Sequence, residues 1–311
     1  MRIKSIDLDK LKTYPIRQRR NLVNIKQFAR LSPPPRGFRR FINELPDILA
    51  GRDFKQLIEA IAKAVKQGKI VGVALGAHII KCGLSPVIID LMKRGVIRAV
   101  AMNGAGAIHD YEISLIGATS EDVRRELPSG KFGMARETPA FFARAAQYAT
   151  RDDIGLGMAC GKLIRTEKNR YAKYSIMAEA ERVGVPVTVH IAFGTDTIHM
   201  HPNISGATLG EATMTDFRLL ASVICHLEGG VWLNIGSAVI LPEVFLKAVT
   251  IAHNLGYKLK NLTTANLDMI QHYRPRTNVT DRPTERGINL TGHHEIMLPL
   301  FRWAVLASLN G

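Results

Sequence analysis

Four apolar, strand-like runs in this chain each stop at a glycine that stands among small or polar residues, and a helix-like segment follows each stop. The turns are Leu75-Gly76-Ala77-His78, Met102-Asn103-Gly104-Ala105-Gly106, Phe193-Gly194-Thr195-Asp196 and Ile235-Gly236-Ser237-Ala238. Strands that alternate with helices are typical of a parallel α/β sheet. Open sheets of this kind bind ligands at the carboxyl ends of their strands. The pattern therefore predicts a Rossmann-like α/β fold with a ligand site along one sheet edge.

The residue types in these turns suit a large anionic ligand. Glycine lets a backbone approach a phosphate closely, and the next helix N-terminus offers free N–H groups and a positive dipole end. Four such turns on one edge favour a dinucleotide. Lys81, just after the first turn, is either a phosphate or carboxylate contact or a solvated lysine.

Hydrophobic periodicity places the other elements. Strands are expected at 70–75, 96–102, 186–192 and 231–235, with a weak one at 262–265. Helices are expected at 53–67, 85–94, 175–183, 213–227, 242–255 and 293–309, and another begins at Thr138-Pro139. The polar segment 268–292 contains Pro275 and Pro283 and four arginines, so we predict a long loop, either exposed or a lid over an acidic substrate. At least five parallel strands are expected.

The charge of the chain is concentrated at its N-terminus. Residues 1–40 hold twelve Lys and Arg against two Asp, which is ten of the fifteen net positive charges. We expect a basic arm over residues 1–44 that packs across a neighbouring subunit, and a single nucleotide-binding and catalytic domain over residues 45–311. The alternatives are that the arm drapes over its own subunit or that it binds RNA, but no recognised nucleic-acid motif accompanies it.

The composition argues against a membrane-spanning protein, a secreted protein and a zinc site. No apolar run reaches the roughly 18–20 residues of a membrane span, and the basic N-terminus lacks the apolar stretch of a secretory signal. Cys82, Cys160 and Cys225 are far apart and show no zinc spacing. We therefore expect a cytoplasmic protein without disulfides.

Asp196, His199 and His201 form the first group with chemical potential. If the segment after the third strand is extended, both imidazoles of the His-x-His pair lie on one side and could bind a metal, with Glu211, Asp216, His293, His294 and Glu295 as further ligands. This would make a metal-dependent hydrolase or lyase. The other interpretation is that Asp196 binds a ribose while His199 and His201 line a metal-free substrate pocket.

His109 and Asp110 form the second group. They follow the Asn103–Gly106 turn, so the imidazole is a candidate general base, and either side chain could hold a ribose. In the alternative, Asp110 only caps a helix and His109 only packs.

Together, these segments resemble deoxyhypusine synthase and its relatives, a superfamily of NAD-binding α/β enzymes. Residues 76–83, with Lys81 and Gly83 included, correspond to the first nucleotide-binding turn of that family, and 103–110 correspond to the second. Thr195-Asp196 is similar to a turn that approaches the cofactor, Gly236-Ser237 to a glycine turn, Thr264-Ala265 to a small pair after a strand, and His294-Glu295 to a segment near the cofactor. The His-Asp turn is also similar to one in archaeal-type ornithine cyclodeaminase relatives. The resemblance implies NAD as cofactor and a homo-oligomer, dimer or tetramer.

Departures from the family restrict the reaction. The family forms an imine on a lysine, and here no lysine follows Lys260. We therefore expect NAD-dependent chemistry on a small polar substrate, with oxidation of an amine or alcohol coupled to elimination or transfer, rather than deoxyhypusine synthesis. Non-catalytic nucleotide or RNA binding is the remaining alternative.

Overall fold

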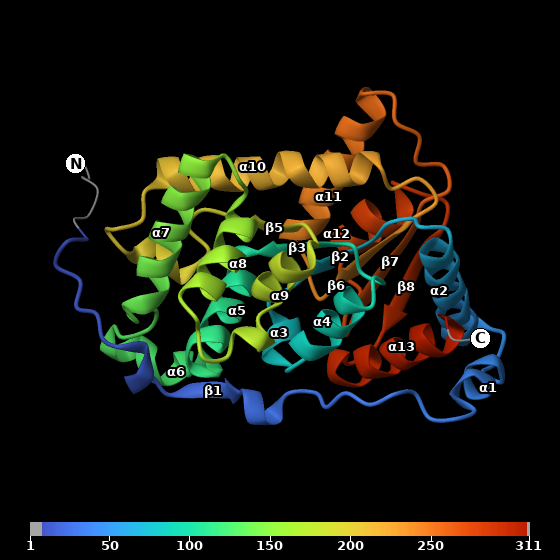
Figure 1. Ribbon diagram of the computed structural model, residues 1–311, viewed down its shortest axis with the longest axis horizontal. Coiled ribbons are helices and arrows are strands. Elements are labelled where there is room, and N and C mark those ends of the chain that lie inside the picture. The colour runs from blue at the N-terminus through green and yellow to red at the C-terminus, as the bar shows by residue number, and fades with distance from the viewer. Residues whose placement is uncertain (1–7, 310–311) are drawn as a thin grey trace.

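The computed structural model describes residues 8–309 and is built around a six-stranded sheet in which all neighbouring strands are parallel (Figure 1). The strands are β2 (Val71–Leu75), β3 (Ala99–Asn103), β5 (Val187–His190), β6 (Val231–Ile235), β7 (Thr263–Asp268) and β8 (Gly287–Thr291). They lie in the order β5-β3-β2-β6-β7-β8. Counted within the sheet this is 3-2-1-4-5-6, the order of Rossmann folds. The predicted fold class is confirmed.

Helices cover both faces of the sheet. In Figure 1, α10 and α11 lie above it and α2, α4 and α13 lie below. The longer helices are α2 (Leu49–Lys66), α4 (Ser85–Lys93), α5 (Gly104–Ile116), α7 (Glu137–Asp152), α8 (Leu156–Thr166), α9 (Ile176–Val183), α10 (Gly206–Cys225), α11 (Ile240–Asn254) and α13 (His294–Leu309). Shorter ones are α1 (Phe38–Asn43), α3 (His78–Lys81), α6 (Val123–Glu126) and α12 (Tyr273–Pro275). Within the described residues, no helix combines the length and the apolar character that a membrane crossing requires.

The central strands are buried on both faces, which explains their nearly continuous apolar sequences. All five residues of β2 and of β6 are buried. Trp232 of β6 stacks on Phe245 of α11 with ring centroids 5.0 Å apart, whereas Leu233 points into the core on the other face. The period-2 alternation of strand side chains thus divides the core between two layers of helices.

Several helix boundaries lie close to the predicted ones. The predicted helices at 85–94, 175–183 and 242–255 are observed as α4, α9 and α11. In contrast, α2 begins at Leu49 rather than at Asp53, and α10 begins at Gly206 rather than at Thr213. The Ser205 side chain caps α10 by accepting from the N–H of Thr208.

The predicted loop at 268–292 is wrong. It contains α12, a π-helix (Arg276–Asp281) and β8, the sixth strand. Strand β7 also runs on to Asp268 instead of ending at Ala265. In β8, Ile288 and Leu290 are buried, Asn289 between them is half-buried and the two end residues are exposed. Because the segment is polar, the sequence did not predict this strand.

The described part of the N-terminal arm packs on its own chain, and packing across a neighbouring subunit stays a prediction. Strand β1 (Asn21–Asn24) pairs antiparallel with β4 (Ala118–Glu121). Beyond it the chain runs past the sheet to α1, where the ring of Phe38 lies 5.5 Å from that of Trp303 in α13 (Figure 1). Residues 1–7 of the predicted arm lie outside the described residues.

Candidate functional site at the carboxyl edge of the sheet

All four glycine turns lie at the carboxyl edge of the sheet, since β2, β3, β5 and β6 run in the same direction. The first and fourth meet between β2 and β6, where the strand order reverses. Gly76 N–H donates to the carbonyl of Ile235 (2.9 Å), and a Cβ on Gly76 would lie 1.8 Å from the carbonyl oxygen of Gly236. Gly236 itself has a φ of 67°. Packing of one backbone on the other therefore requires both glycines, whatever ligand binds there.

His294 and Asp268 lie beside this contact, at the start of α13 and the end of β7. His294 is 1% exposed, its Nε2 lies 3.6 Å from an Asp268 carboxylate oxygen, and its Nδ1 has no hydrogen-bond partner among the described residues. Burial raises the pKa of Asp268, but His294 and the Met269 N–H outweigh it, and the pKa lies below its usual value. The exposed ring of His78 is 6.0 Å away, and burial together with the charges of His294 and Lys81 lowers its pKa.

A second group of polar residues lies at the end of β3. Asn103 caps α5 by accepting from the N–H of Gly106 (3.0 Å). A Cβ on Gly104 would lie 2.1 Å from Oδ2 of Asp196, so the carboxylate lies directly against the first residue of this thirteen-residue helix. Asp196 is 8% exposed, and its Oδ2 has no hydrogen-bond partner among the described residues. Burial raises the pKa of Asp196 to about 6.

The Asp196 backbone is held by His199. The Nδ1 of His199 accepts from the N–H groups of Gly194 and Asp196, both at 3.2 Å. Because Nδ1 is the acceptor, the ring proton of neutral His199 lies on Nε2, a buried atom without a partner among the described residues. The ring also lies 5.3 Å from that of Phe193. His199 therefore shapes the loop that presents the Asp196 carboxylate.

His199 and His201 do not converge, so the expectation of a metal-binding pair is wrong. Residues Thr197–Met200 form a 3-10 helix rather than an extended segment, and side chains two positions apart then point about 120° away from each other. The Nε2 of His201 donates to the carbonyl of Gly133 (2.7 Å). Within the part of the chain that the structure describes, no three His, Cys, Asp or Glu side chains are grouped as metal ligands would be.

Asp110 is a structural residue rather than part of this edge. It is fully buried, and its carboxylate accepts from the Ser175 hydroxyl (2.5 Å) and from the N–H groups of Ile176 (2.7 Å) and Met177 (3.1 Å). It thereby caps α9 from α5, and the predicted catalytic role does not fit this geometry. His109 is half-buried and contacts Thr119 instead.

Of the other predicted cofactor contacts, some lie at the carboxyl edge of the sheet and some do not. Thr264 and Ala265 are interior residues of β7, fully buried, and the Thr264 hydroxyl donates to the carbonyl of Val279, so they are not at the edge. The carbonyl of Gly83 accepts from Ala29 of the N-terminal arm. Ala77, Lys81, Ala105, Ser237 and Glu295 do flank the turns, and the Glu295 carboxylate accepts from the thiol of Cys82.

The sequence did not predict a chain of hydrogen-bonded side-chain amides beneath the carboxyl edge of the sheet. Asn234 Nδ2 donates to Asn266 Oδ1 (2.7 Å) and to the carbonyl of Ser237 (2.9 Å), and Asn266 Nδ2 donates to Gln271 Oε1 (2.6 Å). Gln271 in turn donates to the carbonyl of Leu290 (3.1 Å). The chain fixes the turn after β6 to the ends of β7 and β8. A lone amide within an apolar strand was the available signal.

The raised pKa of Asp196 predicts how the free energy of unfolding changes with pH. A carboxyl whose folded pKa is about 6, against 3.8 ordinarily, contributes stability that is present below pH 3.8 and is lost as the pH rises through 6. Asp196→Asn removes this loss, so we expect the variant to gain about 2 to 3 kcal/mol over the wild type between pH 4 and pH 8. Urea unfolding at both pH values measures it. An equal difference at the two values would contradict the prediction.

Comparison with known proteins supports the fold. No protein-family model and no curated protein matches the sequence. The complex of AgrE with ornithine and NAD+ is similar over 90% of this chain and 34% of that one, at 14% identity and a TM-score of 0.51. A conserved putative LOR/SDH protein from Methanococcus maripaludis S2 is similar over 90% and 74%, at 16% identity and a TM-score of 0.50. A putative deoxyhypusine synthase from Entamoeba histolytica gives 9% identity and a TM-score of 0.49 over 96% and 97%.

These likenesses are distant, and this chain spans about a third of the length of AgrE. At such identities the AgrE and LOR/SDH structures, with TM-scores of 0.51 and 0.50, show only a shared architecture, the parallel sheet with helices on both faces.

Proposed function

We propose that this protein is an NAD-dependent enzyme that acts on a small polar substrate, by oxidation of an amine or alcohol coupled to elimination or transfer. One observation carries the proposal. The Asp196 carboxylate is buried against the N-terminus of α5, at the carboxyl edge of a Rossmann-ordered sheet, with one oxygen unpartnered among the described residues. Burying a carboxylate without a partner costs free energy. A ligand hydroxyl, such as that of a ribose, would satisfy it.

The residues at this edge fit a dinucleotide. The start of α5 is the candidate site for a phosphate, as helix N-termini are, although Asn103 already accepts from the N–H of Gly106. Asp196 would accept from ribose hydroxyls, and the turn that carries Gly76 and His78 would lie along the pyrophosphate. The AgrE complex contains NAD+ and ornithine, and the fold similarity to it supports this assignment in general terms.

The proposed oxidation divides into two transfers. NAD, when bound, supplies the acceptor for the hydride that leaves carbon. The proton that leaves the substrate oxygen or nitrogen needs a base on the protein, and His109 is our candidate. It lies on α5, five residues beyond the helix start.

Calorimetric titration with NAD tests the proposal. We expect binding, and at a hundredfold excess over Kd a stabilisation of about 2.7 kcal/mol in thermal unfolding. Asp196→Asn should weaken NAD binding at least tenfold, since an amide accepts fewer hydrogen bonds than a carboxylate. Glu285→Gln is the matched control, because this exposed carboxylate precedes β8 at the opposite edge of the sheet. Absence of binding, or equal affinity in both variants, would refute the assignment.

The homo-oligomer stays a prediction. Exposed apolar side chains follow four strands at the carboxyl edge, namely Phe193, Val239, Met269, Ile270 and Ile296. Such a group is covered by a ligand, a moving loop or another subunit in many proteins. Light scattering with and without NAD would show which of these applies.

A further inference from the structure

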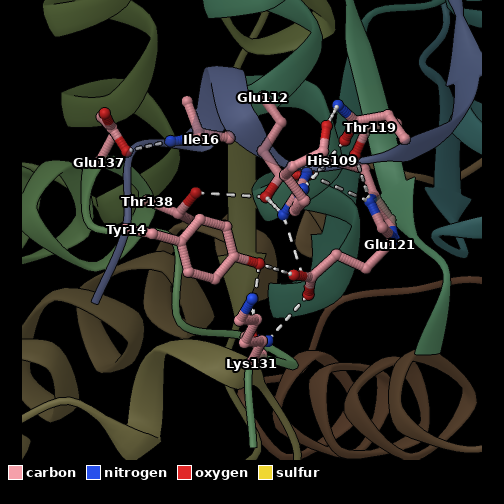
Figure 2. Close-up of polar contacts among 12 residues, drawn as sticks. Tyr14, Ile16, His109, Glu112, Thr119, Glu121, Lys131, Glu137 and Thr138 are labelled. Atoms are coloured by element: carbon pink, nitrogen blue, oxygen red, sulfur yellow. Dashed lines mark hydrogen bonds and ion pairs between the residues drawn. The ribbon is translucent and has the colours of Figure 1, made fainter. Parts of the chain in front are cut away.

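The buried carboxylate of Glu112, on α5, is surrounded by four hydrogen-bond donors. The Arg19 guanidinium binds both oxygens, Nη1 to Oε1 at 2.8 Å and Nη2 to Oε2 at 2.6 Å. The hydroxyl of Thr138 donates to Oε1 (3.2 Å) and that of Thr119 to Oε2 (2.5 Å), as Figure 2 shows. Burial raises the pKa of Glu112, but His109 and Arg19 outweigh it and lower the pKa to about 2. Glu112 is therefore an anion.

This anion determines where the Thr119 proton lies. A carboxylate only accepts, so the short contact between Thr119 and Glu112 uses the single proton of the hydroxyl. The Thr119 oxygen also lies 2.7 Å from Nδ1 of His109. With its own proton already donated, that oxygen has to accept from His109. Nδ1 of neutral His109 therefore carries the ring proton, and Nε2 holds the free electron pair.

We infer that Arg19 of the N-terminal arm fixes the tautomer of His109 through Glu112 and Thr119, and so leaves Nε2 as a proton acceptor. Arg19 is then a positioning residue, since it acts through Glu112 and Thr119 and touches neither His109 nor the sheet edge. The tautomer follows from this hydrogen-bond chain and from the Glu112 carboxylate, whose Oε2 lies 3.9 Å from Nδ1 of His109, and not from any cofactor. The use of Nε2 as the base for substrate oxidation rests on the proposed function.

The position of His109 determines what this tautomer can do. His109 follows the Asn103–Gly106 turn on the same helix, about 7.5 Å along the axis from the helix start, and 18% of its side chain is exposed. An imidazole that is not fully buried and has an unprotonated Nε2 can accept a proton from a ligand that reaches it. With the opposite tautomer, Nε2 would be a donor until the ring flipped.

A second contact fixes the arm to the same place. The Tyr14 hydroxyl donates to Glu121 (2.7 Å), which also accepts from the N–H of Gly133 (2.8 Å) and lies 3.9 Å from Arg19 (Figure 2). Ser120, between Thr119 and Glu121, has a φ of 67°, in the left-handed region that costs a non-glycine residue free energy. The backbone conformation that aligns Thr119 and Glu121 with the arm therefore costs free energy.

Histidine-ring 15N NMR at pH 8, on the full chain without cofactor, tests the inference. The signal of His109 is assigned by its loss in His109→Gln. We expect its Nδ1 to be protonated and its Nε2 unprotonated in the wild type. Thr119→Val removes the acceptor of the Nδ1 proton and should shift the population toward Nε2–H, and Thr119→Ser should restore it. Thr138→Val is the matched control: it removes another hydroxyl from the same carboxylate and should leave the tautomer unchanged.

Arg19 variants test the role of the arm. In Arg19→Met, the buried Glu112 loses its cation and takes up a proton more readily, so Thr119 is free to donate to Nδ1 and the Nε2–H form should grow. Arg19→Lys keeps the charge but cannot bind both oxygens, and we expect an intermediate population. A wild-type ring protonated on Nε2, or a tautomer unchanged in the Arg19 variants that fold, would overturn the inference. Because no cofactor is present, neither result depends on whether NAD binds.

Discussion

Replacing Gly76 with alanine is expected to lower the free energy of unfolding by about 4 kcal/mol, more than most core substitutions do. The added Cβ would lie 1.8 Å from the carbonyl oxygen of Gly236 and 2.5 Å from its carbonyl carbon. Both atoms belong to backbone, so no side-chain rotation relieves the collision. The turns after β2 and β6 would have to separate and break the hydrogen bond from Gly76 to Ile235.

Gly210→Ala is the matched control for this experiment. Gly210 lies inside α10, and a Cβ there would meet only the ring of Phe193 at 3.9 Å, an ordinary contact. Alanine is the better helix former, so this variant should be more stable than the wild type by up to about 1 kcal/mol. Guanidinium unfolding of the three proteins measures both changes. A loss below about 1 kcal/mol for Gly76→Ala would mean that the two turns are not in contact.

This substitution also separates two explanations of the glycine turns. The sequence pattern suggested that glycine serves a phosphate, and the contact between Gly76 and Gly236 shows that packing between turns is a sufficient reason for these two. Gly104 differs, since the group that it accommodates is the side chain of Asp196. Evidence for a nucleotide therefore comes from Asp196 more than from the glycines themselves.

The parallel sheet was predictable because its signals are local. Strands buried on both faces have continuous apolar sequences, and helices such as α4, with a proline in its first turn, and α9, capped by Ser175, begin at residues that can be recognised. Strand β8 was missed because an edge strand with one buried side lacks that signal. The end of β7 was misplaced because Asn266 and Asp268 are polar yet buried, and their partners Asn234 and His294 are far away in the sequence.

In the candidate site, too, the local signals were predictable and the tertiary contacts were not. That the turns share an edge follows from the strand direction alone. The roles of single residues did not follow: Asp110 caps a helix 65 residues away in sequence, and Arg19 binds a carboxylate 93 residues away. His199 and His201 point apart because the Asp196 backbone donates to His199 and a 3-10 turn results. Such partners are set by tertiary packing, which a single sequence does not reveal.

Asp216→Ala is expected to have the other large effect, a loss of about 3 to 5 kcal/mol. Asp216 lies on α10, is fully buried, and accepts from the N–H groups of Gly157 at the start of α8 (2.9 Å) and Val189 of β5 (2.8 Å). Alanine would leave both donors buried without an acceptor, at about 1 to 3 kcal/mol each, and would leave a cavity. Thermal and urea unfolding at pH 4 would show the loss.

Asp216→Asn separates the hydrogen bonds from the charge. Its amide oxygen can accept from both N–H groups, so at pH 4, where the wild-type carboxyl is protonated when folded, we expect a loss of about 1 kcal/mol or less. Burial outweighs these hydrogen bonds and raises the pKa of Asp216 from 3.8 to about 8. The stability linked to its proton is therefore lost as the pH rises from about 4 to 8, whereas the amide does not titrate. Above pH 8 the asparagine variant should equal or exceed the wild type, and equal losses for Ala and Asn at pH 4 would show that Asp216 does not hold these two elements together.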